Sequence, residues 1–190
     1  MSKESELQVN VLIKSHHASA GICEFTVTGD DSFNINDNAI SLSGDVYGPL
    51  CKRSQTLPTR VPLVTDNIEG TYAAQATITD PTPWSPELPA TYTVTVQMTS
   101  AANRSKTGKH QFGFKALETR SQSFYLNQRR FVPRIIQLDS SSDALDSLLD
   151  IVTEEHLCLA TSHPAPALLK MASEQGCWIF VVLTGSESIQ

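Results

Sequence analysis

The chain has 190 residues, of which 40% are hydrophobic and 18% charged, a composition typical of folded globular proteins and not of disordered or fibrous ones. Twenty acidic residues against 14 basic ones give a net charge of -6, and the strongest basic cluster is the pair Arg129-Arg130. Nucleic acid is therefore not an expected partner, because phosphate binding needs concentrated positive charge. The amino-terminal stretch lacks an apolar run, which predicts neither a secretory leader nor a membrane anchor and favours a cytoplasmic chain.

The cysteines indicate thiols and not a disulfide framework or a metal centre. Cys23, Cys51, Cys158 and Cys177 are widely spaced, form no CxxC pair, and three of them lie in or beside apolar runs. Such spacing favours buried free thiols. Glycine-rich phosphate loops are absent as well, so no cofactor and no bound metal are expected.

Residues 1–119 show the alternation of half-buried antiparallel strands. Apolar and polar residues alternate through four segments, and turn-forming residues separate them. The alternating apolar positions are Leu7, Val9, Val11, Ile13; Cys23, Phe25, Val27; Tyr72, Ala74, Ala76, Ile78; and Tyr92, Val94, Val96, Met98. Several short strands at this spacing predict a two-sheet β-sandwich.

Residues 120–190 show a different pattern, β-α-β-α-β, which predicts a parallel sheet with helices on it. The apolar run 131–136 is expected to form the first strand, and Asp143 is expected to cap a helix carrying Leu145, Leu148, Leu149 and Val152 on one face. A second apolar run, 157–160, precedes a helix that opens at 164–166 and ends at Gly176. Residues 178–183 form the third run.

Three stretches, in order, resemble glycoside hydrolase family 2, the family of β-galactosidases, β-glucuronidases and β-mannosidases. They are similar to the family's segments WSPexPxLY, FGFR with FxLNG, and RTSHYP…LLxLxDExG. Here they read Pro83-Trp84-Ser85-Pro86-Glu87-Leu88-Pro89 with the strand at 92–96, Phe112-Gly113-Phe114-Lys115 with Phe124-Tyr125-Leu126-Asn127, and Thr161-Ser162-His163-Pro164 with Leu168-Leu169 and Glu174-Gln175-Gly176. The resemblance implies an immunoglobulin-like β-sandwich over 1–119 followed by a truncated segment, 120–190, of a (β/α)8 barrel with about three strands and two helices.

The departures from the family pattern bear on activity. Gln128 replaces a glycine, Ala160 an arginine and Ser173 an aspartate, and residues 134–139 lack the family's His-Glu pair. The resemblance places the two catalytic glutamates beyond the fourth and seventh barrel strands, and this chain provides three strands. Since a retaining glycosidase needs two carboxyl groups about 5 Å apart, no catalytic residue is assigned and the chain alone is not expected to hydrolyse glycosides.

His163 and Arg134 are the candidate substrate-binding residues. His163 is expected at the carboxyl end of a barrel strand, where the active-site residues of this fold gather, and Arg134 at the matching place on the first strand. The alternatives are a loop histidine bonded to backbone and a structural ion-pair arginine. Trp84 could stack on a sugar ring, but packing at a sandwich edge is favoured for it, and packing is expected for Trp178.

The leading hypothesis is a family 2 glycosidase-like protein or fragment linked to carbohydrate metabolism and lacking the catalytic glutamates. A carbohydrate ligand is then possible, and because the parallel sheet is incomplete, self-association or a partner chain is expected. The alternative is a non-catalytic carbohydrate-binding or assembly module. A third possibility is a hydrolase that uses other carboxylates, such as Asp139 with Glu187.

Overall fold

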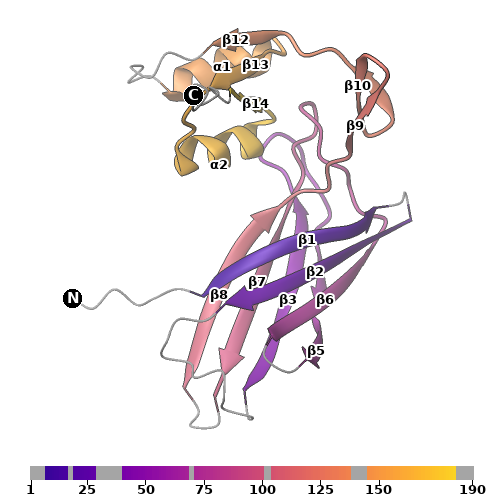
Figure 1. Cartoon of the computed structure of the whole chain (residues 1–190), viewed down its shortest axis with the longest axis vertical. Coiled ribbons are helices and arrows are strands. Elements are labelled where there is room, and N and C mark those ends of the chain that lie inside the picture. The colour runs from indigo at the N-terminus through magenta and orange to yellow at the C-terminus, as the bar shows by residue number, and fades with distance from the viewer. Residues whose placement is uncertain are drawn as a thin grey trace, which may run out of the picture. The chain divides into compact units, whose positions relative to one another are not determined.

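The computed structural model describes residues 7–16, 19–28, 40–68, 71–100, 104–137 and 145–182. The chain forms two compact units, one made of residues 1–50, 56–83 and 90–114 and the other of 51–55, 84–89 and 115–190 (Figure 1). The sequence predicted the boundary between the sandwich and the β/α segment at residues 119 and 120. The structure puts this boundary between residues 114 and 115, and it groups residues 51–55 and 84–89 with the second unit as well.

The first unit is a β-sandwich of two antiparallel four-stranded sheets, as the alternation predicted. The first sheet has the order β1-β2-β6-β5, with β1 Gln8–His16, β2 Ala20–Thr28, β5 Val64–Ile68 and β6 Thr71–Thr79. The second has the order β4-β3-β7-β8, with β3 Ser41–Leu50, β4 Thr59–Pro62, β7 Thr91–Thr99 and β8 Ser105–Phe112. The chain changes sheets between β4 and β5 at Leu63, whose N–H donates to the carbonyl of Gly44 at 3.0 Å.

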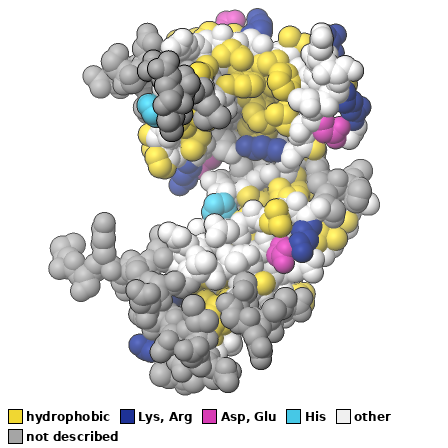
Figure 2. Space-filling view, in the orientation of Figure 1, with side chains coloured by type: hydrophobic (Ala, Val, Ile, Leu, Met, Phe, Trp, Pro, Cys, Tyr) yellow, Lys and Arg dark blue, Asp and Glu magenta, His cyan; other side chains and the backbone are white. Residues whose placement is uncertain are grey.

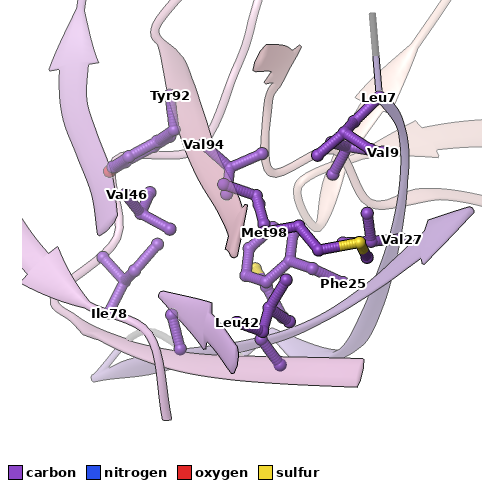
Figure 3. Close-up of a cluster of buried hydrophobic side chains, with 14 of the residues drawn as sticks. Leu7, Val9, Phe25, Val27, Leu42, Val46, Ile78, Tyr92, Val94 and Met98 are labelled. Carbon is purple, nitrogen blue, oxygen red and sulfur yellow. The ribbon is translucent and has the colours of Figure 1, made fainter. Parts of the chain in front are cut away.

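The core of the sandwich lies between the two sheets. Side chains from both inner faces point toward one another (Figure 3). Phe25, Val94 and Met98 are completely buried, and Phe114 packs edge-on against Tyr92 with ring centroids 5.2 Å apart. Period-two burial thus follows the predicted apolar positions, because alternate residues of a strand face the same side.

The second unit begins with a small antiparallel sheet that the sequence did not predict. It has the order β11-β10-β9, with β9 Leu117–Arg120, β10 Ser123–Leu126 and β11 Arg129–Phe131. A parallel sheet of order β12-β13-β14 follows, with β12 Ile135–Gln137, β13 Cys158–Thr161 and β14 Trp178–Val181. The predicted single strand over 131–136 is therefore wrong: Pro133 separates β11 from β12, and a proline cannot donate to a ladder.

Helices α1 Leu145–Glu154 and α2 Pro166–Gln175 connect the parallel strands, which confirms the β-α-β-α-β order. Register partners Ile136, Leu159 and Ile179 join a core with Leu149 and Val152 of α1 and with Leu168 and Ala172 of α2. Gly176 ends α2 at φ 84°, as predicted. The predicted cap Asp143 lies outside the described residues.

All four cysteines are free thiols. Burial raises the pKa of Cys23 to about 12, and burial followed by the neighbouring Cys158 raises that of Cys177 to about 11. Among the described residues, no helix has the length and apolar character needed to cross a membrane.

Candidate functional site at the carboxyl edge of the parallel sheet

The carboxyl ends of β12, β13 and β14 meet at one edge of the parallel sheet, because the three strands run in the same direction. Gln137, Thr161 and Val181 are the last strand residues there. The N–H of Val182 donates to the carbonyl of Thr161 at 2.9 Å, which extends the pairing of β13 and β14 by one step. Ligands of open α/β sheets bind at this edge, so it is the candidate site.

His163 lies at this edge, as predicted. It follows β13 by two residues and precedes α2, and its side chain is exposed. Within the part of the chain that the structure describes, the imidazole makes no hydrogen bond or ion pair. A role in binding substrate stays a prediction, and so does the alternative of a loop histidine bonded to backbone.

Arg134 does not lie at this edge, and its predicted position is wrong. It directly precedes β12, at the amino end of the sheet, where its carbonyl accepts from the N–H of Cys158 at 2.7 Å. Its guanidinium donates to the carbonyl of Glu155 just after α1. The structure therefore does not bring Arg134 and His163 together, and Arg134 acts as a cap on the end of a helix.

The other described groups at the carboxyl edge are neutral. Gln137 and Ser162 are exposed, and Ala160 lies between Gln137 and Phe180 in register, on the face opposite the helices. Among residues 7–16, 19–28, 40–68, 71–100, 104–137 and 145–182, no group of three or more His, Cys, Asp or Glu side chains could hold a metal ion.

An aromatic cluster at the amino edge of the sheet was not predicted. Trp84 is completely buried and meets Trp178 of β14 edge-on, with ring centroids 5.1 Å apart. Phe131 packs on the same Trp178 at 5.8 Å. Trp84 is thus packed, as favoured, but against the β/α unit and not at a sandwich edge, and its burial leaves no face for a sugar.

Lys115 adds a cation to this cluster. Its ammonium lies 4.1 Å from the ring centroid of Trp84 and 5.6 Å from that of Trp178. Part of the side chain is exposed, but desolvation of the ammonium end lowers the pKa of Lys115. The faces of the rings oppose that effect, because their negative quadrupoles attract the charged form.

Asn127 connects the small sheet to Trp84. Its backbone N–H donates to the carbonyl of Ala116 at 2.8 Å, its side-chain oxygen accepts from the N–H of Ala116, and its side-chain nitrogen donates to the carbonyl of Trp84 at 2.8 Å. Asn127 and Gln128 form the two-residue turn between β10 and β11, both with positive φ, 49° and 69°. Asn127, the last residue of the FxLN segment, therefore both forms the turn and binds the backbone of Trp84 in the WSP segment.

A family model described as "Glycosyl hydrolases family 2" matches residues 2–115, which is the sandwich and its exit. No curated protein sequence matches the chain.

Solved structures resemble the chain over more than the sandwich. A Bifidobacterium dentium β-glucuronidase matches 93% of this chain with a TM-score of 0.68 at 14% identity. A Bacteroides uniformis β-glucuronidase matches 91% with a TM-score of 0.67 at 16% identity. Another from that organism, β-glucuronidase 2 covalently bound to cyclophellitol-6-carboxylate aziridine, matches 90% with a TM-score of 0.64 at 18% identity.

These matches extend beyond residue 115, since they cover at least 90% of the chain. The chain in turn spans only 22% to 31% of the length of those three proteins. At these identities the likeness shows a shared fold.

Proposed function

The chain belongs to glycosyl hydrolase family 2, and on this premise we propose that it provides the sandwich and the first β/α units of a glycosidase barrel without being a hydrolase by itself. The sandwich is then of the immunoglobulin-like type, and β12, β13 and β14 are the first three barrel strands. The parallel strands, the helices packed on one face and the match of the structural relatives beyond residue 115 support this assignment.

The observation that carries the proposal is the composition of the carboxyl edge. The described residues there offer an imidazole, an amide and a hydroxyl, from His163, Gln137 and Ser162, but no carboxylate. Retaining glycoside hydrolysis needs one carboxyl group to protonate the leaving oxygen and a second to attack the anomeric carbon. His163 can bind sugar hydroxyls by donating and accepting hydrogen bonds, which is binding without the chemistry of hydrolysis.

Turnover of aryl β-glycosides tests this proposal. The purified chain, at high concentration, is incubated with chromogenic galactoside, glucuronide, mannoside and glucoside, and release of the aryl group is followed. We expect no release above that of a heat-denatured sample. Hydrolysis that disappears in the double variant Asp139→Asn, Glu187→Gln would overturn the proposal in favour of a self-sufficient hydrolase.

The second candidate is a non-catalytic carbohydrate-binding or assembly module, and the distribution of exposed apolar side chains favours it. Of the eleven large hydrophobic residues that are exposed in the part of the chain that the structure describes, eight lie in the β/α unit, and hydrophobic side chains gather on that unit's surface in Figure 2. The eight are Leu117, Phe124, Val132, Ile135, Ile151, Leu169, Val181 and Val182. Apolar surface of this kind marks an interface, so we propose association with a second copy or with a partner chain.

A further inference from the structure

Two short segments, residues 51–55 and 84–89, belong to the β/α unit although they lie within the sequence range of the sandwich. The chain consequently passes between the two units five times, at residues 50/51, 55/56, 83/84, 89/90 and 114/115. We call the two segments together the latch. Their contacts concentrate on the carboxyl end of α2 and on β14.

Trp84 is the central residue of the latch. Its indole N–H donates to the carbonyl of Ser173 in the last turn of α2 at 2.8 Å, and its own carbonyl accepts from the side chain of Asn127. Its ring packs on Trp178 and lies under the ammonium of Lys115. One buried residue therefore joins α2 and β14 through its side chain and the turn after β10 through its backbone carbonyl.

Residues 52, 53 and 86 add contacts to the same end of α2. Arg53 donates to the carbonyls of Gln175 at 3.4 Å and of Pro86 at 3.2 Å. The ammonium of Lys52 lies 2.5 Å from a carboxylate oxygen of Glu174. The backbone of Pro86 lies so close to Gly176 that a Cβ there would be 2.3 Å from the carbonyl oxygen.

These contacts complete the end of a helix. The last carbonyls of an α-helix have no partner within it, and the last turn of α2 contains no basic residue to bind them. The backbone N–H groups of residues 176 and 177 donate to the carbonyl of Ala172. The carbonyls of Ser173 and Gln175 accept instead from the side chains of Trp84 and Arg53. The latch thus binds two carbonyls of the last turn, those of Ser173 and Gln175, in addition to the local cap that Gly176 provides.

The core of the β/α unit is small. Six buried residues form that core, against sixteen in the sandwich, among the residues that the structure describes. We infer that the latch is a conformational device: it holds α2 and β14 in place, and its release opens the β/α unit while the sandwich stays folded. Local opening of this kind occurs in cooperative units and with separate free energies.

Cysteine labelling tests the inference, since each unit buries its own thiols. Cys23 lies in the sandwich core, and Cys158 and Cys177 are buried in the β/α unit. Labelling of each thiol by iodoacetamide, followed by mass spectrometry in low urea, measures how often its surroundings open. The variants are Trp84→Phe, which keeps an aromatic ring but removes the N–H donor, and Arg53→Ala. The control is Arg60→Ala, which removes an exposed ion pair with Asp45 in the sandwich.

We expect labelling of Cys158 and Cys177 to accelerate about tenfold in Trp84→Phe, the factor that corresponds to ~1.4 kcal/mol for a lost hydrogen bond that leaves a carbonyl unpaired. Cys23 should keep its rate, and the control should change none of the three. Acceleration of Cys23 together with the other two would show one cooperative unit and overturn the inference. Unchanged rates in both latch variants would overturn it as well. Arg53→Ala removes no buried ring, so it keeps the test valid if Trp84→Phe disturbs packing.

Discussion

Gln128 shows how a single residue departs from what its backbone position favours. A left-handed conformation costs a residue with a Cβ roughly 1–2 kcal/mol, and the two-residue turn requires it at both Asn127 and Gln128. Asparagine tolerates it, and glycine accepts it freely. The exposed side chain of Gln128 bonds with Arg120 and Glu118, which are exposed or half-buried and so repay little of that cost.

We therefore expect Gln128→Gly to raise the free energy of unfolding by about 1 kcal/mol relative to Gln128→Ala. Both variants lose the same polar contacts, so the alanine variant is the matched control. Urea unfolding followed by tryptophan fluorescence measures the difference, because both tryptophans of the chain, Trp84 and Trp178, lie in the unit that contains the turn. Equal stability of the two variants would contradict the argument.

Cys23 makes the stability of the sandwich depend on pH. Burial holds its folded pKa at about 12, above the ordinary value of 9.0, so the folded state retains a proton that the unfolded state releases. The contribution of the protonated thiol to the free energy of unfolding is fully present below pH 9. It is lost as the pH rises from 9 toward 12, at up to about 1.4 kcal/mol per pH unit. Urea unfolding of the wild type and of Cys23→Ala at pH 7.5 and pH 10 checks this. The stability advantage of the wild type should shrink at pH 10, and an advantage independent of pH would contradict it.

At the scale of elements, the sequence predicted what local chemistry decides and missed what distant contacts decide. Alternation identified the strands of the sandwich, and the early proline and late glycine identified α2. The position of Trp84 could not be predicted, because its partner Ser173 lies 89 residues away. Arg134 was misplaced because the apolar run 131–136 gives no sign of which residues pair, and the break at Pro133 moves the arginine to the amino end of β12.

The candidate site was predicted in part. His163 is at the carboxyl edge because the strand and helix on either side of it have clear patterns in the sequence. The helix cap made by Arg53 and Trp84 has no local signal at all, apart from the absence of a basic residue in the last turn of α2. Even so, the resemblance had singled out the segments that contain Trp84, Lys115 and Asn127.

Gly176 lies where the end of α2 contacts Pro86 of the latch. Substitutions there separate the effect of backbone strain from that of a Cβ placed against Pro86. Gly176→Ala adds both the strain of φ 84° and a Cβ against Pro86, whereas Gly176→Asn adds the same Cβ with less backbone strain. If the approach of Pro86 dominates, both variants lose about 2–3 kcal/mol of stability in the β/α unit. Thermal unfolding monitored by tryptophan fluorescence measures the loss. A much milder effect of asparagine would show that backbone strain, and not the latch, requires the glycine.

At the scale of the whole molecule, the two units differ in how well they cover their apolar surface. The sandwich closes a core between two sheets, while the β/α unit carries most of the large hydrophobic residues that are exposed among those described. That imbalance is the reason to expect association.

We predict concentration-dependent self-association through the β/α unit, measured by sedimentation velocity at micromolar concentrations. Val181→Asp, at the exposed end of β14, should shift the chain toward monomer by placing a charge in the interface. Leu12→Asp is the matched control, since Leu12 is exposed on the sandwich and its replacement should change nothing. A wild type that sediments as a monomer throughout would contradict the prediction, unless an added partner chain forms a complex that Val181→Asp prevents.

A covalent probe tests the proposal that this chain has no catalytic carboxylate pair. A cyclophellitol-6-carboxylate aziridine is bound covalently in a structural relative from Bacteroides uniformis. Incubating the chain with this compound and with a neutral cyclophellitol aziridine, followed by intact mass spectrometry, detects any carboxylate able to open the ring. We expect an unchanged mass for this chain and full labelling of a complete β-glucuronidase treated in parallel. Stoichiometric labelling of one Asp or Glu would contradict it and show that the chain holds a working nucleophile.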